Sequence, residues 1–374
     1  MLTSVPGLGD NNSPHPTMAR RTLLLLLSAS LSGAHGALLP VWPNINGNIV
    51  IGTASAHFSR DFVVTWTGPG ALDAAWYQSR VRSAAAASSF SAGTLASVTV
   101  SAPLSSPTTL SPTMDESYSM ACLSTSCTID ALSFVGALRG LETLTQLAQS
   151  NGAPIQVPLG ISNDAPRFPY RGLLVDCARR FLPPASIKRV LDFMSTTKLN
   201  VLHMHLTDST AFPLESALYP ALSAKGAYHP KAVYSKADLA DLVAYATRRG
   251  VRVVPEIDMP GHSSFGKGLP ELTIAACGGV LNPTLEGTYT MLKGFLGEVA
   301  ALFPDPYLAL GGDEVSFADC ATADAGVKAW LAVHNMTAAS LLPWFWRRMA
   351  EDVLPDVDRQ LAAQGLPGKL TVTE

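Results

Sequence analysis

The fold of this chain is decided by the stretch KLNVLHMHLTD, residues 198–208. Its run 201–206 is mostly apolar, which is typical of a parallel strand that is buried on both faces. Comparable apolar runs occupy 173–175, 251–257, 307–310 and 370–372. Segments with the periodicity of amphipathic helices separate them, at 187–194, 235–250, 289–302 and 327–353. The alternation predicts an α/β fold, a (β/α)8 TIM barrel of which only about five βα units are present.

One of these helices carries start and stop signals. Ser235 and Asp238 have the spacing of a capping box, in which each side chain accepts a hydrogen bond from the backbone of the other residue. Gly250 follows the last periodic residues, as is typical of a helix that ends there.

Composition narrows the classes of protein to consider. The chain has 374 residues, 47% hydrophobic and 15% charged, so it buries a large core and is not disordered. A net charge of -3 lacks the basic excess that phosphate backbones require, and we expect no nucleic-acid partner. No apolar run approaches the roughly 20 residues of a membrane span, so we expect none.

The chain divides into three regions by composition. Residues 1–36 read as a leader and signal peptide, because a basic pair at 20–21 precedes consecutive leucines at 23–27 and a tail of small residues. This places the protein in the secretory pathway, lysosomal or secreted. Residues 37–165, rich in Ala, Ser, Thr and Gly, read as a small α+β domain, and 166–374 as the incomplete catalytic barrel.

Cysteines and a sequon add covalent expectations. An odd number of cysteines leaves at least one unpaired, and none of their spacings is that of a zinc site. The sequon Asn335-Met336-Thr337 predicts a glycosylated Asn335 if the region lies on the surface. The cysteines are Cys122, Cys127, Cys177, Cys277 and Cys320.

Ionisable side chains stand where the predicted strands end. The carboxyl ends of the strands in a parallel barrel converge on one mouth, where barrel active sites lie. Buried charge is costly unless it is paired or used, so this convergence favours a catalytic site. The residues concerned are Asp176, His203, His205, Asp208, Glu256, Asp258, His262, Asp313 and Glu314.

Asp313 and Glu314 are neighbours, and neighbours on a regular strand point to opposite faces. Gly311 and Gly312 directly before them permit a bend that could bring both carboxylates into one pocket. Two carboxylates in one pocket repel each other, which raises one pKa and leaves the other group ionised. The pair therefore predicts an acid beside a charge stabiliser.

Several segments in this order resemble glycoside hydrolase family 20, the β-N-acetylhexosaminidases, in the style of the lysosomal enzymes. The resemblance covers roughly 115–320, whereas 37–111 resembles the family's smaller N-terminal domain only loosely. The segments are DESY at 115–118, GALRGLET at 136–143, RFPYRGLLVD at 167–176, KLNVLHMHL at 198–206, PGH at 260–262 and LGGDEV at 310–315.

The resemblance implies hydrolysis of terminal non-reducing N-acetyl-β-D-hexosamine residues from glycoconjugates or chito-oligosaccharides, with retention of configuration and without a cofactor. Glu314 would be the general acid, and Asp313 would stabilise the substrate's acetamido group while it forms an oxazolinium intermediate. Asp208 and His262 would form a relay that tunes Glu314. Arg171 would grip ring hydroxyls, and His205 is a further substrate-binding candidate.

The cysteine pairing follows in part from the same resemblance. It places a disulfide between Cys277 and Cys320, which follow two predicted strands that end at the same mouth. Cys122 and Cys127 could pair or both remain reduced, with Cys177 as the free thiol.

Two departures leave alternatives open. Met204 and Ser209 stand where many relatives carry Trp and Asp, and the sequence given stops in the fifth strand, before the family's last three strands. From this we expect little activity and low stability, with a homodimer as one way to cover the open edge. A truncated, inactive sugar-binding or interaction protein is therefore one alternative. A metal-dependent hydrolase using His203, His205, Asp208, Asp258 and His262 is another.

Overall fold

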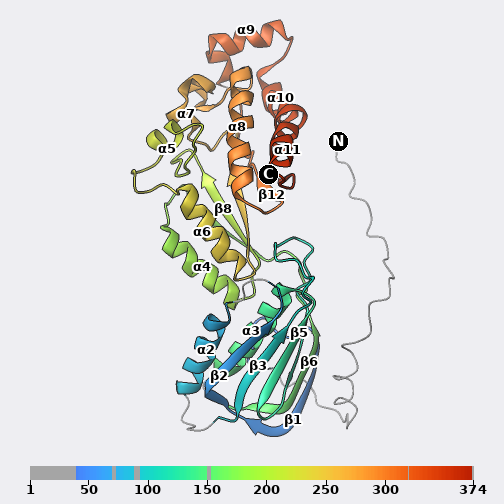
Figure 1. Ribbon diagram of the computed structural model, residues 1–374. Coiled ribbons are helices and arrows are strands. Elements are labelled where there is room, and N and C mark those ends of the chain that lie inside the picture. The colour runs from blue at the N-terminus through green and yellow to red at the C-terminus, as the bar shows by residue number, and fades with distance from the viewer. Residues whose placement is uncertain (1–38, 70–72, 88–92, 150–152, 319, 373–374) are drawn as a thin grey trace, which may run out of the picture. The chain divides into compact units, whose positions relative to one another are not determined.

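The computed structural model describes residues 39–69, 73–87, 93–149, 153–318 and 320–372. One compact unit extends from Pro40 to Glu374 (Figure 1). The predicted leader and signal peptide lies outside the described residues. Within the described ranges, no helix has both the length and the apolar character needed to cross a membrane.

The first part of this unit is a six-stranded sheet with the order β1-β6-β4-β5-β3-β2. Strands β2, β3 and β5 run parallel, and the hairpin β4-β5 together with β6 and β1 is antiparallel. Its elements are β1 (Asn48–Ala56), β2 (Phe58–Thr67), α2 (Ala74–Ala87), β3 (Leu95–Ser101), β4 (Tyr118–Cys122), β5 (Ser126–Ala131), α3 (Phe134–Gln149) and β6 (Ile155–Asp164).

The short β-like runs 62–66 and 96–100 lie in β2 and β3, and the helical pattern at 138–147 lies in α3. Strand β6 contains Pro158, which is unusual away from the edge of a sheet. The Val157–Pro158 peptide bond is cis. Helix α3 is buried almost all round because it packs on the sheet and on α2 and also contacts Thr196, Lys198 and Gly250 in the second part. A side chain at Gly250 would press on Leu138 and Val135 of this helix.

The second part is a parallel sheet of five strands with the order β13-β12-β9-β8-β7, and helices follow the strands along the chain (Figure 1). The predicted apolar runs are thus confirmed as strands. They are β7 (Gly172–Asp176), β8 (Val201–Thr207), β9 (Arg252–Ile257), β12 (Tyr307–Ala309) and β13 (Leu370–Val372). The helices between them are α4 (Pro184–Thr196), α6 (Lys236–Thr247), α8 (Glu286–Leu302) and α11 (Leu354–Ala363).

The predicted capping box at the start of α6 is confirmed. The Ser235 hydroxyl accepts a hydrogen bond from the Asp238 backbone N–H at 3.0 Å, and the Asp238 carboxylate accepts one from the Ser235 N–H at 3.0 Å. The exchange satisfies two backbone N–H groups that a helix start leaves without a partner, and it fixes where α6 begins.

Short elements fill the connections at the carboxyl ends of the strands. The single helical region expected at 327–353 is divided, because Asn335 takes a left-handed conformation, φ 51°, and ends the first helix there. The connecting elements are α5 (Ala221–Gly226), α7 (Phe265–Gly268), η1 (Pro270–Leu272), β10 (Thr273–Ile274), η2 (Ala275–Cys277), β11 (Val280–Leu281), η3 (Ala321–Ala323), α9 (Ala325–Val333), η4 (Ala338–Ser340), α10 (Leu341–Arg348) and the π-helix η5 (Met349–Val353).

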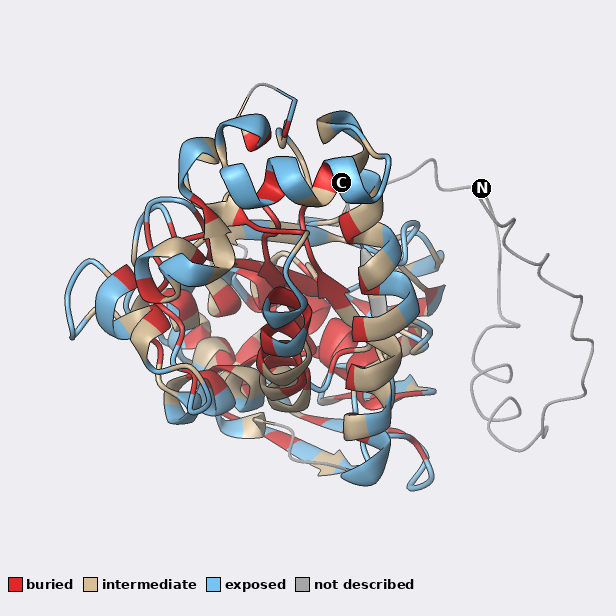
Figure 2. Cartoon of the chain, turned by 90° about the horizontal axis from the view of Figure 1, so that it is seen from above, coloured by how far each residue is buried: buried red, intermediate tan, exposed pale blue. Residues whose placement is uncertain are grey.

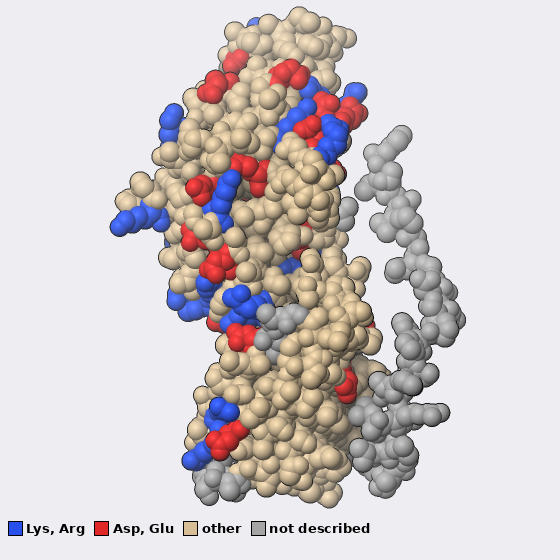
Figure 3. Space-filling view, viewed as in Figure 1, with Lys and Arg blue, Asp and Glu red and all other residues tan. Residues whose placement is uncertain are grey.

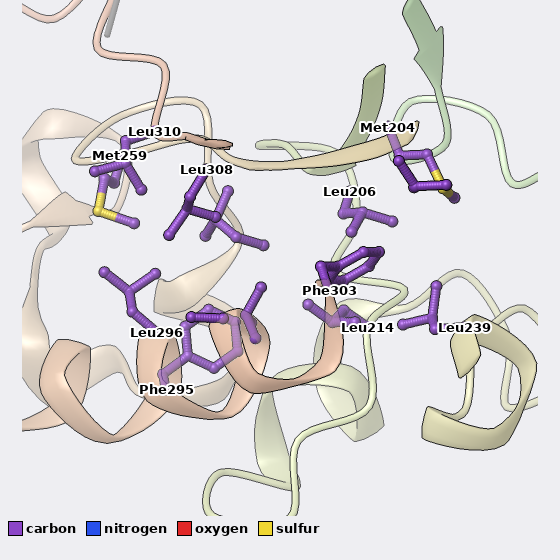
Figure 4. Packing of buried hydrophobic residues seen from close by; sticks show 14 of the residues in the cluster. Met204, Leu206, Leu214, Leu239, Met259, Phe295, Leu296, Phe303, Leu308 and Leu310 are labelled. Atoms are coloured by element: carbon purple, nitrogen blue, oxygen red, sulfur yellow. The ribbon is translucent and has the colours of Figure 1, made fainter. Parts of the chain in front are cut away.

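Strand β8 separates the core from the polar interior by simple alternation. Leu202, Met204 and Leu206 are fully buried against the helix layer, where Figure 4 shows Met204 and Leu206 among apolar side chains of the same cluster. His203 and His205 point to the other face. In Figure 2 the buried residues gather on the strands and on the inward sides of the surrounding helices. Met204 is therefore a core residue.

The disulfide predicted between Cys277 and Cys320 is present and joins the loops that follow β9 and β12. Cys122 and Cys127 also pair, which settles the alternative left open by the sequence, and Cys177 is free and buried. Asn335 is exposed, which meets the condition set for its sequon.

Candidate active site

Asp208 lies at the centre of the charged side chains that follow the parallel strands. Its side chain is 2% exposed, and its Oδ1 accepts hydrogen bonds from the backbone N–H and the hydroxyl of Thr210 at 3.0 and 3.1 Å. Its Oδ2 lies 2.9 Å from Arg179 and 3.8 Å from the Nδ1 of His262. The turn made with Thr210 thus fixes one oxygen and leaves the other facing Arg179 and His262.

His262 bridges the loops that follow β9 and β12. Its Nε2 lies 3.2 Å from an oxygen of Glu314, so Asp208, His262 and Glu314 form a chain of polar contacts. His262 and Glu314 both have positive φ, 42° and 52°, a region that side chains other than glycine occupy at a cost. The Glu314 side chain is 77% exposed, so it is accessible to a ligand.

The two glycines before Asp313 are required by their surroundings. Gly311 and Gly312 have φ of 61° and 118°. A Cβ on Gly311 would lie 2.0 Å from the Oδ1 of Asp258, and one on Gly312 would lie 2.7 Å from the Trp346 ring. The bend they allow brings one ligand atom each from Asp313, Glu314 and His262 within 4.8 Å of one another. The bend therefore places both carboxylates close to each other and to His262.

A second group of buried ionisable residues lies behind this pocket. The two carboxylate oxygens of Glu256 contact the Nε2 of His203 at 2.6 Å and the Nδ1 of His205 at 3.1 Å. Burial alone would raise the pKa of Glu256, but the two imidazoles outweigh it and lower the pKa to about 2. The same carboxylate outweighs the effect of burial on His205 and raises its pKa.

Asp258 behaves in the opposite way. Burial, followed by the nearby carboxylates of Asp313 and Glu256, raises its pKa to about 7. Its Oδ1 accepts a hydrogen bond from the Gly312 N–H at 3.2 Å, and its own N–H donates to the Thr207 hydroxyl at 3.1 Å. The carboxyl group of Asp258 is therefore packed directly against the bend that carries Asp313.

Arg171 is not among these residues, which corrects the role expected for it. It precedes β7, at the opposite end of that strand from Asp176. Its guanidinium donates to both oxygens of Glu116, at 3.1 and 2.5 Å, and to the carbonyl of Lys198 at 2.9 Å. Arg171 is thus taken up by an ion pair that holds the start of the strand.

The arginine at the mouth is Arg179, which sequence reasoning missed. It donates to Asp176 at 3.0 Å and lies 2.9 Å from Asp208, with its side chain 53% exposed. Asp176 also accepts from the backbone N–H groups of Ala178 and Arg179, which forms the turn after β7. The position of Arg179 just past the end of β7 was the signal from which the sequence could have placed it at the mouth.

The surroundings of His205 argue against the substrate-binding role expected for it. His205 is 5% exposed and already contacts Glu256, so it offers little surface to a sugar. Two residues differ from those that many relatives carry. Ser209 is exposed and lies beside Asp208, whereas Met204 lies in the core. The polar neighbours of Asp208 are instead Arg179, Thr210 and, at 3.8 Å, His262.

The residues named for the metal-dependent alternative do not form one ligand set. Within the described residues two groups have ligand-like spacing, one with His205, Glu256 and Asp258, the other with His262, Asp313 and Glu314. The residues named for this alternative are divided between these groups, and His203 and Asp208 belong to neither. In the first group the imidazole and the carboxylate of Glu256 satisfy each other as an ion pair. This pairing does not favour a metal centre.

Two neighbouring carboxylates at the carboxyl ends of parallel βα strands are the arrangement expected of a glycosidase-like barrel protein. Residues 168–362 match the glycosyl hydrolase family 20 catalytic domain, and residues 50–147 match the domain described as beta-acetyl hexosaminidase like. The chain belongs to glycosyl hydrolase family 20.

Curated relatives agree with this assignment. The β-hexosaminidase subunit alpha of Rattus norvegicus is 36% identical over 255 residues, which cover 65% of this chain and 48% of that protein. The subunit beta of Felis catus is 43% identical over 215 residues, which cover 55% of this chain and 40% of that protein. The chain thus spans about half or less of the length of these relatives.

Solved structures place the fold in the same family. The chitobiase of Flavobacterium johnsoniae has a TM-score of 0.71 and 26% identity, over 90% of this chain and 52% of that one. The family 20 exo-β-N-acetylglucosaminidase of Vibrio harveyi, solved with N-acetylglucosamine, has a TM-score of 0.68 and 26% identity, over 91% of this chain and 56% of that one. The five parallel strands are therefore part of a TIM-type barrel, as the sequence predicted.

Proposed function

We propose that the protein hydrolyses terminal non-reducing N-acetyl-β-D-hexosamine residues, and that the residues after β8, β9 and β12 carry its catalytic chemistry. The observation that carries this proposal is the chain of contacts from Asp208 through His262 to Glu314, with Asp313 in the same pocket. The family membership supports the substrate class, and the geometry supports the assignment of roles.

Glu314 would donate its proton to the glycosidic oxygen while the substrate's acetamido oxygen attacks the anomeric carbon and the leaving group departs. Asp313 would stabilise the positive charge that develops on the acetamido group. Water would then open the oxazolinium and give its proton to Glu314, which restores the acid and retains the configuration. His262, whose Nδ1 lies 3.8 Å from Asp208, contacts the Glu314 carboxylate that must exchange this proton.

Arg179 replaces Arg171 in this proposal as the residue that grips sugar hydroxyls. Its guanidinium is half exposed at the mouth and is oriented by Asp176 and Asp208. A planar fork of donors held in this way can bind two neighbouring hydroxyls at once.

The test is binding of an N-acetylglucosamine thiazoline, a stable analogue of the oxazolinium, together with hydrolysis of a chromogenic N-acetyl-β-D-glucosaminide. We expect the wild type to bind the thiazoline and Asp313→Asn to bind it at least tenfold more weakly, because a neutral amide does not offset the developing charge. Equal affinity of the two would exclude the substrate-assisted mechanism. Sugar binding without turnover would favour the alternative of a non-catalytic homologue.

A route through the secretory pathway is a separate proposal. It rests on the signal-peptide pattern at 1–36 and on two disulfides, which persist in oxidising compartments. The exposed Asn335 would then carry a glycan, and a lysosomal or secreted location would follow. Expression in a eukaryotic cell and treatment with a glycosidase specific for N-linked glycans should lower the mass of the protein; an unchanged mass in the Asn335 peptide would count against the modification.

A further inference from the structure

The structure assigns a positioning role to Asp258, which rests on the proposed function of the neighbouring pocket: we infer that its carboxyl group holds the Gly311–Gly312 bend so that Asp313 and Glu314 face the substrate together. Asp258 comes directly after β9, and the bend comes directly after Ala309 and Leu310 at the end of β12. The residue therefore lies where two catalytic loops meet.

The contact is specific in its geometry. The Oδ1 of Asp258 accepts a hydrogen bond from the Gly312 N–H at 3.2 Å. The same oxygen would lie only 2.0 Å from a Cβ on Gly311, so it leaves no room for a side chain there. A positive φ at both glycines is thus combined with a carboxyl oxygen packed on the inner side of the bend. Without that oxygen, the Gly312 N–H would have no acceptor in its present direction.

The backbone on both sides of Asp258 is held as well. The N–H of Asp258 donates to the buried Thr207 hydroxyl at 3.1 Å, and the N–H of Met259 donates to the Leu310 carbonyl at 3.0 Å. The backbone that carries this carboxyl group is therefore anchored to the end of β8 and to the residue after β12. An anchored acceptor can fix the bend, whereas a mobile one could not.

Charged groups surround Asp258 from several elements. Glu256 lies on β9, Asp313 on the loop after β12, His205 on β8, and Arg179 on the turn after β7. The like charges of Glu256 and Asp313 add to burial in favouring the neutral carboxyl form. A neutral Asp258 keeps its acceptor oxygen for Gly312 without adding negative charge beside Asp313.

Two variants separate this role from general stability. Asp258→Asn keeps an acceptor oxygen of the same shape, and Asp258→Ala removes it. Asp305→Ala is a matched control, because Asp305 is also buried and pairs with Arg252 at the other end of β9. All would be measured in the full chain by hydrogen exchange with mass spectrometry on a peptide covering 310–317, by thiazoline affinity and by thermal melting.

We expect Asp258→Ala to exchange at least tenfold faster in the 310–317 peptide and to bind thiazoline at least tenfold more weakly, with Asp258→Asn within threefold of the wild type in both. Asp305→Ala should melt earlier while the 310–317 peptide remains protected. Unchanged exchange in Asp258→Ala, or equal loss in Asp258→Asn and Asp258→Ala, would overturn the inference. A wild type that does not bind thiazoline would instead contradict the proposed function, and the exchange result would still decide the role of Asp258.

Discussion

Two groups of buried charges occupy opposite ends of the parallel strands, and they differ in how completely their charges are satisfied. At the amino ends, Glu116 accepts from Arg139, Arg171 and Asn200, at distances of 2.5 to 3.1 Å. Lys198 nearby donates to the Thr143 hydroxyl at 2.6 Å, and burial lowers its pKa to about 8. At the carboxyl ends, Asp258 stays close to other acids and Glu314 reaches into solvent.

This difference in pairing indicates which charges stabilise the fold. The carboxylate of Glu116 has a cation or amide for each oxygen, so it joins the N-terminal sheet to the parallel strands and has no capacity left for a ligand. At the mouth, positive φ at His262 and Glu314 and like charges around Asp258 are kept at a cost, which is typical of sites that bind or react. Figure 3 shows charged residues over the parallel-strand part and fewer on the visible face of the N-terminal sheet.

The largest effect should come from Glu314→Gln. The leaving oxygen would lose its proton donor, and turnover in a form of the protein that hydrolyses substrate should fall by about 10²- to 10⁴-fold. Thermal melting should hardly change, because the side chain is 77% exposed. The measurement is kcat on an unactivated chitobiose substrate, and near-normal rates would rule out Glu314 as the acid.

The amino-end cluster should respond in the opposite sense. Glu116→Ala would leave Arg139 and Arg171 without their common partner, and the free energy of unfolding should fall by about 3–5 kcal/mol. Urea unfolding measures this loss. Thiazoline affinity of the fraction that remains folded should be unchanged. A variant of unaltered stability would show that the contacts of Glu116 are not the link between the two parts of the unit.

The two clusters should also differ in the pH dependence of stability. Burial opposes ionisation of Glu116, but Arg139 and Arg171 lower its pKa, so its contribution is present above the ordinary carboxyl range and is lost as pH falls. Asp258, with a pKa raised from 3.8 to about 7, contributes stability at low pH that is lost as pH rises through about 7. Allowing for solvent at the open pocket, that loss should be on the order of 2 kcal/mol.

Unfolding in urea between about pH 2 and 8 checks this difference, because the loss for Glu116 lies below the ordinary carboxyl pKa and that for Asp258 lies above it. Glu116→Gln should flatten the acid side of the stability curve, and Asp258→Asn the side near neutrality. Glu256 raises the pKa of His205, so the stability that His205 contributes is also lost as pH rises. Asp258→Asn should therefore keep part of the slope of stability against pH. A neutral-side slope that is identical in wild type and Asp258→Asn would contradict the ionisation assigned to Asp258.

The sequence predicted the strands and the mouth because both follow from local patterns. Buried runs and the period of α6 set the parallel sheet, and Gly311 with Gly312 indicated the bend before Asp313. Arg171 received its expected role from the family resemblance, although it stands at the start of the predicted strand and not at its carboxyl end. Glu116, its partner, lies 55 residues away in the chain, so no local pattern could reveal the pair.

Substituting lysine for Arg179 or Arg171 should have the smallest effect, and the two variants compare the two ends of the strands directly. Lysine keeps the charge but loses the planar fork, so each substitution tests what its fork binds. Arg179→Lys should weaken thiazoline binding by about tenfold, near 1.4 kcal/mol, and leave the melting temperature within error, since its side chain is 53% exposed. Arg171→Lys should lower stability by about 1–2 kcal/mol, because it breaks the two-pronged contact with Glu116, and leave affinity unchanged. Each variant is the other's control under calorimetry and thermal melting. Weaker binding in Arg171→Lys at unchanged stability would return the sugar-binding role to Arg171 and reverse the assignment of the two ends.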